Sequence, residues 1–139
     1  MSAIPARDPH FGPVPESAWE ADRVAQLRGR VEVFNATRPG GLDGWTMDLE
    51  QYTHMRGHIL AMLQDECDDR GTVPLKDLVS AAQDRYGTHP AFPGGRLRNY
   101  CTYTKVDLEA RCLIERVPGP GPQRLRLATE PATGTEGRS

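Results

Sequence analysis

The chain has 139 residues, with 17 basic and 19 acidic side chains and a formal net charge of −2. This length fits one domain, whereas 37% hydrophobic residues, 14 glycines and 12 prolines predict a core smaller than the chain. The near-neutral charge excludes a polybasic protein that coats nucleic acid by charge alone. We expect no membrane-spanning helix, because no run approaches about 20 apolar residues, and no secretory signal, because prolines break the N-terminus and it has no apolar segment.

The two ends of the chain differ from its middle. Residues 1–30 are predicted to be a largely disordered or weakly helical tail, and residues 129–139, which carry no large apolar side chain, a disordered one. Val31, Val33 and Phe34 belong to a short alternating run that predicts a strand, which ends at a turn-rich segment. The folded domain is therefore expected to span residues 31–128.

Three helices are predicted next. The first begins at Asp48, with Gln51 three residues later in a capping-box pattern, and places its apolar side chains on one face. A second, after the extended residues Thr72–Pro74, ends at Gly87. The third runs from Leu97 to about Arg111, and its core stripe consists of Leu97, Cys101, Thr104 and Leu108.

The last predicted element is a β-hairpin. Residues 113–117 and 123–127 are β-prone and flank a proline–glycine turn, Pro118 to Pro122. Leu125 and Leu127 alternate with arginines, whereas the first arm is less regular, so we expect a distortion in its pairing.

The order helix, short extended segment, helix, helix, hairpin resembles that of a winged helix-turn-helix domain. The stretch KVDLEARCLIERVPGPGPQRLRLA looks like the end of a winged-helix third helix, its hydrophobic exit and its wing. Over roughly residues 31–128 the chain also resembles a small, uncharacterised bacterial winged-helix family, including Val31–Val33 and Tyr52–Arg56. The resemblance implies an α+β winged helix, a three-helix bundle with a β-hairpin wing, plus an added N-terminal strand. Cys112 stands where many winged helices have glycine, so either the backbone there is left-handed and mildly strained, or the helix ends differently.

Charge is distributed unevenly along this domain. Residues 45–87 hold four basic and eight acidic side chains, whereas residues 88–127 hold seven basic and three acidic ones. The split favours a domain that presents its third helix and wing to an anion such as DNA phosphate, although a solvated basic face is the alternative. The cations concerned are Arg96, Arg98 and Lys105 on the third helix, and Arg116, Arg124 and Arg126 on the wing.

The outer face of the third helix carries the functional prediction. It presents Asn99, Thr102, Tyr103 and Val106, with Arg98 on its flank. Asn and Arg suit bidentate contacts to base edges, and Thr and Val methyl groups can meet a thymine methyl. Val106, Ala110 and Leu113 also form an apolar patch there, which the strand near residue 31, Trp45 or a second subunit could cover.

Two functions follow from this face. One is a DNA-binding transcriptional regulator, cytoplasmic and expected to be a homodimer, that binds double-stranded DNA. The alternative is a winged-helix module that docks a protein partner without binding DNA. Solvent exposure of Asn99, Thr102 and Val106 would support the first, and coverage by residues 31–47 the second.

Other chemistry is weakly indicated. The three cysteines, Cys67, Cys101 and Cys112, form no C-x-x-C pair, which argues for a reducing compartment. No phosphate loop or nucleophile elbow occurs, so we expect neither enzyme activity nor a cofactor.

Three residues of the first predicted helix could still carry a site. His54 and His58 have metal-ligand spacing but are expected to be an exposed pair, since no glutamate completes H-E-x-x-H. Arg56 projects into the apolar face and is expected to form an ion pair with Asp107 or Glu109, with anion binding as the alternative.

Overall fold

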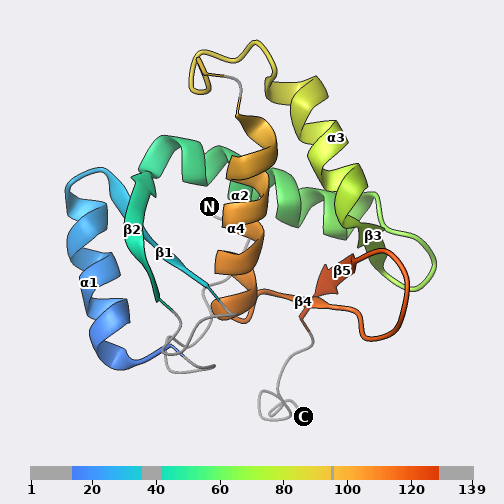
Figure 1. The fold of residues 1–139 in the computed structure, drawn as a ribbon, viewed down its shortest axis with the longest axis horizontal. Coiled ribbons are helices and arrows are strands. Elements are labelled where there is room, and N and C mark those ends of the chain that lie inside the picture. Colours follow the sequence, from blue (N-terminus) through green and yellow to red (C-terminus); the bar gives the residue numbers. More distant parts are fainter. Residues whose placement is uncertain (1–13, 36–41, 95, 129–139) are drawn as a thin grey trace.

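Four helices and two small antiparallel sheets form an α+β fold in the described part of the chain, residues 14–35, 42–94 and 96–128 of the computed structural model (Figure 1). The helices are α1 (Glu16–Leu27), α2 (Leu49–Asp65), α3 (Leu75–Tyr86) and α4 (Leu97–Ala110). The strands are β1 (Arg30–Phe34), β2 (Leu42–Asp48), β3 (Thr72–Pro74), β4 (Ile114–Arg116) and β5 (Arg124–Leu127). None of these helices is long and apolar enough to cross a membrane. Residues 1–13 of the predicted N-terminal tail, and the predicted C-terminal tail of residues 129–139, lie outside the described residues.

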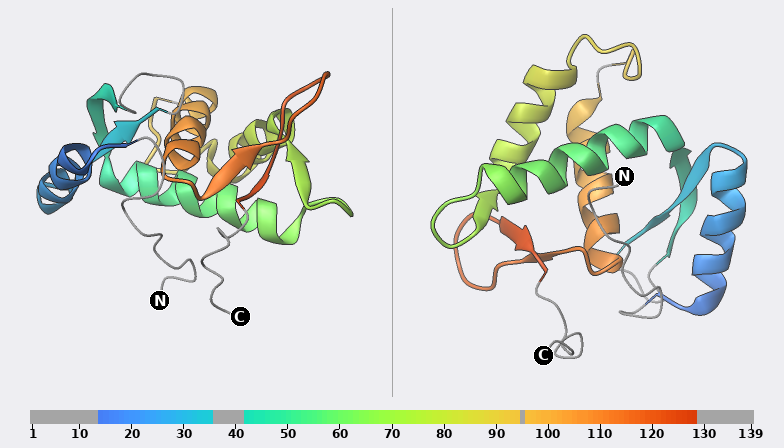
Figure 2. Two further views of the ribbon diagram at one scale, coloured as in Figure 1. Left: turned by 90° about the horizontal axis from the view of Figure 1, so that it is seen from below. Right: turned by 180° about the vertical axis from the view of Figure 1, so that it is seen from behind.

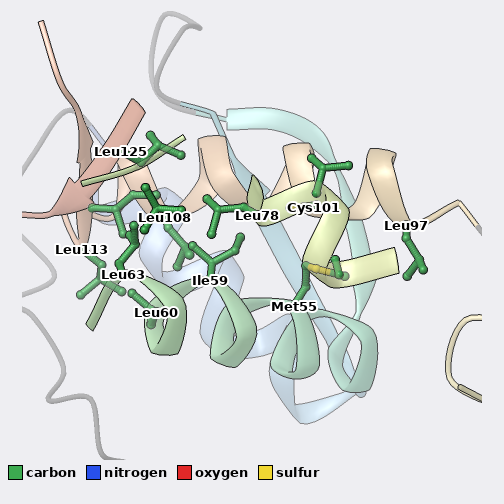
Figure 3. Packing of buried hydrophobic residues seen from close by; sticks show 14 of the residues in the cluster. Met55, Ile59, Leu60, Leu63, Leu78, Leu97, Cys101, Leu108, Leu113 and Leu125 are labelled. Carbon is green, nitrogen blue, oxygen red and sulfur yellow. The ribbon is translucent and has the colours of Figure 1, made fainter. Parts of the chain in front are cut away.

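The main core lies between α2, α3 and α4 and is closed by the sheet that contains β5 (Figure 3). Ile59, Leu78, Leu108 and Leu125 come from these four elements and are each fully buried. The core stripe predicted for the third helix is confirmed, because its four members are all buried. Burying each of these aliphatic side chains stabilises the fold by about 1.5–3 kcal/mol.

The predicted start of α2 is confirmed, although only half of the capping box forms. The carboxylate of Asp48 accepts a hydrogen bond from the backbone N–H of Gln51 at 3.1 Å. The side chain of Gln51 does not return to the cap. It donates instead to the carbonyl of Ala91 at 2.7 Å, which fastens the segment before α4 to the beginning of α2.

The end of α4 has a left-handed residue, the first of the two alternatives that the sequence left open at Cys112. Cys112 has φ of 65°. The N–H of Leu113 donates to the carbonyl of Leu108 at 3.0 Å, and the N–H of Cys112 to that of Glu109 at 3.1 Å. This pair of bonds is a Schellman motif, and Leu108 and Leu113 both belong to the main core, which supplies its hydrophobic contact.

The predicted hairpin is confirmed and belongs to a three-stranded sheet in the order β3-β5-β4. Ile114 pairs with Leu127 and Arg116 with Leu125. Pairing between the two arms is regular over these residues, so the expected distortion of the first arm is wrong. The short segment before α3 is also a strand, since Thr72 pairs with Arg126 and Pro74 with Arg124.

The N-terminal part of the fold is more extensive than predicted. The strand near Val31 is confirmed as β1, and it pairs with β2, of which only the first three residues fall in the segment predicted to be turn-rich. Helix α1 packs beside β1 and buries Ala18, Asp22 and Ala25. The folded unit therefore includes α1 and does not begin at Val31.

Candidate nucleic-acid interface

Helix α4 and the loop of the β4–β5 hairpin lie on the side of the molecule that faces away from α2 (Figure 2, left). On α4, Arg98 and Asn99 are exposed, and Thr102 and Val106 are half-buried. The hydroxyl of Thr102 donates to the carbonyl of Asn99 at 3.1 Å, inside the same helix. The N-terminal half of the predicted contact face is therefore open to solvent.

The β1–β2 hairpin covers one flank of the same helix. The rings of Trp45 and Tyr103 meet edge to face with their centroids 5.0 Å apart. The hydroxyl of Thr104 contacts the sulfur of Met47 at 3.8 Å. Tyr103 keeps 38% of its surface exposed, so the cover is partial. Asn99 stays exposed and Val106 is half-buried, whereas Ala110, at the end of the predicted apolar patch, is buried against Phe34 of β1.

Lys105 does not reach this face, although it was predicted to contact DNA. It is 3% exposed, and its ammonium lies 3.2 Å from the carboxylate of Glu109, one turn further along α4. Because Lys105 is buried and its ammonium is paired with Glu109, it presents no cation to a phosphate.

The three arginines predicted for the hairpin differ in their surroundings. Arg116 is exposed. Arg124 lies 3.2 Å from the hydroxyl of Thr72 and 3.7 Å from the carboxylate of Asp68. Arg126 lies 2.6 Å from the carboxylate of Glu115, its cross-strand neighbour. Exposed pairs of this kind contribute about 0–1 kcal/mol, so Arg124 and Arg126 can exchange their carboxylates for phosphate at little cost.

Asp68 is held in place by the turn before β3. Its carboxylate accepts hydrogen bonds from the N–H of Arg70, and from both the N–H and the hydroxyl of Thr72, at 2.8–2.9 Å. These donors lower the pKa of Asp68, with the backbone N–H of Thr72 as the largest cause. The carboxylate opposite Arg124 therefore stays ionised.

A groove of about 220 Å³ lies between the N-terminal halves of α3 and α4 and the hairpin loop. Its polar side chains are Lys76, Arg98, Thr102 and Gln123, and Leu75 and Val79 provide apolar surface. The N–H of Leu75 donates to the carbonyl of Gln123 at 2.9 Å, which fixes the loop against α3. Lys76 was not among the predicted cations, because it lies in the acidic half of the domain. Only its place in the first turn of α3 could have indicated it.

Arg96 occupies the N-cap position of α4 and is exposed. It lies one turn before the outward face that carries Asn99. With Arg98 and Lys76 it makes three exposed or groove-lining cations near the beginnings of α3 and α4.

The C-terminal half of α4 carries a buried charge network in place of a contact surface. Arg111 donates to the carboxylates of Asp107 at 2.8 Å and Asp22 at 3.0 Å, and its guanidinium carbon lies 4.2 Å from the ring centre of Phe34. Asp107 also accepts the hydroxyl of Tyr52 at 2.7 Å. Burial opposes the charge of Arg111, but these carboxylates hold its pKa above the ordinary value. For the hydroxyl of Tyr52, burial and the nearby carboxylate of Asp107 both raise the pKa, to well above its usual range.

This network corrects the expected role of Arg56. Asp107 pairs with Arg111, and Glu109 pairs with Lys105, so both carboxylates find their cations on α4 itself. Arg56 is half-buried. The helical projection was wrong about which arginine is buried, because the β1–β2 hairpin and α1 create a second interior on the far side of α4.

The two histidines of α2 are also not an exposed pair. His58 is 2% exposed, and its Nε2 donates to the carbonyl of Leu78 at 3.0 Å. Burial lowers the pKa of His58. His54 lies 3.7 Å from the carboxylate of Glu50, and its ring packs against that of His89 with centroids 4.6 Å apart. Within residues 14–35, 42–94 and 96–128, no group of three or more His, Cys, Asp or Glu side chains could hold a metal ion.

Comparison with known proteins gives one match. The model of a family of unknown function (DUF6958) matches residues 30–125, from the first residue of β1 into β5. No curated protein and no solved structure matches the chain. The matched range includes the groove and α4, and leaves out α1 with Asp22.

Proposed function

The chain belongs to this family of unknown function, and we propose that it is a winged-helix protein that binds double-stranded DNA and regulates transcription. In this proposal α2, α3 and α4 form the three-helix bundle, β3 is the short strand within it, and the β4–β5 hairpin is the wing. The element order and the β3-β5-β4 sheet support this assignment. Helix α4 would enter the major groove, as second helices of helix-turn-helix units do.

The groove between α3, α4 and the wing carries the proposal. Lys76 and Arg98 come from different helices and line the same groove, beside the exposed amide of Asn99. Cations that converge from two helices near a polar helix face suit a phosphate backbone, which passes beside any helix inserted into a groove. Arg96, at the N-cap of α4, and Arg116, in β4, are two further exposed cations.

The number of cations sets the expected affinity. Each neutralised phosphate contributes a slope of about −0.9 to the dependence of log K on log salt, so four contacts predict a slope of roughly −3 to −4. Such a module binds weakly by itself. A homodimer on two half-sites would raise the affinity, and we propose one on that ground.

A second candidate function is docking to a protein. The observation that favours it is the pair Trp45–Tyr103, an aromatic surface beside α4 that keeps Tyr103 38% exposed. Aromatic side chains are enriched at protein interfaces. The ion pairs of Arg124 and Arg126 also reduce the positive charge that the wing offers.

Fluorescence anisotropy with labelled duplex DNA over a range of salt concentrations tests the first proposal. The double variant Lys76→Ala, Arg98→Ala is expected to bind at least about tenfold more weakly and to lower the salt slope by about 2. Arg85→Ala is the matched control, because it removes an exposed cation from the opposite end of α3.

Two results would count against DNA binding. The first is wild-type protein that binds no duplex in a salt-dependent way, and the second is an equal loss in the Arg85→Ala control. Purification of the tagged chain with a stoichiometric protein partner, and with no DNA, would favour docking instead.

A further inference from the structure

We propose that the outward stripe of α4 formed by Asn99, Thr102 and Val106 selects A·T base pairs over G·C pairs. This inference rests on the proposed DNA binding and names the sequence class that the same surface prefers. The three residues follow the spacing i, i+3 and i+7, so they lie on one side of the helix. At 1.5 Å per residue they span about 10 Å, the length of roughly three base-pair steps.

The hydroxyl proton of Thr102 is already used. It is donated to the carbonyl of Asn99 at 3.1 Å, which orients the hydroxyl along the helix. Thr102 therefore offers a ligand its methyl group and a hydroxyl oxygen that can only accept. Together with the methyl groups of Val106, half-buried one turn further along, this methyl group makes the middle and end of the stripe largely apolar.

The side chains that recognise G·C pairs are directed elsewhere. Guanine is read mainly by Arg or Lys, and cytosine by Glu or Asp. Arg98 lines the groove beside α3 and the wing together with Lys76, where the two cations can neutralise the backbone, and Thr102 belongs to both the groove and the stripe. Lys105 and Glu109 are paired with each other, and their side chains are only 4% and 11% exposed. Arg96 is the N-cap residue of α4 and precedes its first helical turn.

The groups that remain match an A·T pair. The exposed amide of Asn99 can donate to N7 and accept from the N6 amino group of adenine in a bidentate contact. Methyl groups of Thr102 and Val106 can contact the 5-methyl group of thymine. Because uracil lacks that methyl and pairs in the same way, replacement of thymine by uracil isolates the apolar contact.

Anisotropy titrations of the full chain at one low salt concentration test the inference with three 20-base-pair duplexes. These are an A·T-rich duplex, a G·C duplex, and the A·T-rich duplex with deoxyuridine in place of thymidine. The wild-type protein is expected to bind the first at least about fivefold more tightly than either of the others.

Matched variants assign the effect to the stripe. Thr102→Ser keeps the hydroxyl and removes the methyl, so it should lose much of the discrimination against deoxyuridine. Thr102→Val keeps a methyl in the same position and should retain it. Asn99→Ala should lose the discrimination of adenine from 7-deazaadenine, which has no N7 acceptor.

The outcomes separate this inference from the proposed function. Equal salt-dependent binding to all three duplexes would overturn the A·T preference and leave DNA binding intact. A preference for A·T that deoxyuridine and Thr102→Ser leave unchanged would also overturn it, because DNA shape would then be the cause. Failure to bind any duplex would overturn both.

Discussion

The guanidinium of Arg111 lies 2.8 Å from the carboxylate of Asp107, one helical turn away on α4, and both side chains are buried. The same two groups reach the strand beside them. Asp107 accepts the N–H of Phe34 at 2.8 Å, and Arg111 donates to the carbonyl of Glu32 at 3.1 Å. Asp22 accepts the N–H of Glu32 at 3.0 Å. Side chains therefore provide for β1 the hydrogen bonds that a third strand would otherwise make.

Loss of one member of this network should be costly. Arg111→Met leaves the carboxylates of Asp107 and Asp22 buried without their cation, and removal of one partner of a buried pair destabilises a protein by about 3–5 kcal/mol. Urea denaturation followed by circular dichroism measures the free energy of unfolding. Arg23→Ala, which removes an exposed arginine from α1, should leave the midpoint nearly unchanged. Equal midpoints for the wild type and Arg111→Met would show that the network is dispensable.

Acidification should destabilise the protein partly through His58. Burial lowers the pKa of this histidine below the ordinary 6.5. As the pH falls through that value, the unfolded chain takes up a proton that the folded protein does not, so the free energy of unfolding decreases. The variant His58→Gln keeps an N–H donor for Leu78 but cannot titrate. Its loss of stability between pH 7.5 and 5.5, from urea denaturation, should be smaller than that of the wild type. An equal loss in both would assign the pH dependence to other groups.

The end of α4 offers a stabilising substitution. Cys112 has φ of 65°, a region that costs residues with a Cβ atom about 1 kcal/mol relative to glycine. Cys112→Gly should therefore raise the free energy of unfolding by about 0.5–1 kcal/mol. Cys112→Ala keeps the Cβ atom and is the control that should bring no such gain. Thermal denaturation of both variants compares them, and a gain in the alanine variant would point to the sulfur instead of the backbone.

The cysteines should react at different rates with a thiol reagent. Burial raises the pKa of Cys101 to about 12, so almost none of it is thiolate at neutral pH, whereas Cys67 and Cys112 are half-exposed. Ellman's reagent should modify two thiols quickly and the third only when urea unfolds the chain. Cys101→Ala should retain both fast reactions and lose the slow one. Fast modification of Cys101 in the native protein would contradict its burial.

Local sequence patterns accounted for much of the fold. Asp48 predicted the beginning of α2 because an N-cap depends on residues within one turn, and the left-handed backbone of Cys112 follows from its position after the last turn of α4. The alternation of Leu125 and Leu127 with arginines predicted β5, because alternation is also a pattern of neighbouring residues. Strand β2 was missed, because it carries Gly44 with φ of 84° and is defined by its pairing with β1.

The amino-acid sequence by itself determined the order of the elements from α2 to β5 and the core stripe of each central helix, since both depend on the periodicity of neighbouring residues. Only the tertiary structure decided which charges are available. Packing of α1 and the β1–β2 hairpin on α4 buries Asp107 and Arg111, and Lys105 is buried beside Glu109, whereas Arg98 and Asn99 stay exposed. It also brings Lys76 and Arg98 to one groove across 22 residues of sequence. A helical projection predicts one buried side for a helix, whereas α4 is buried on two sides in the structure.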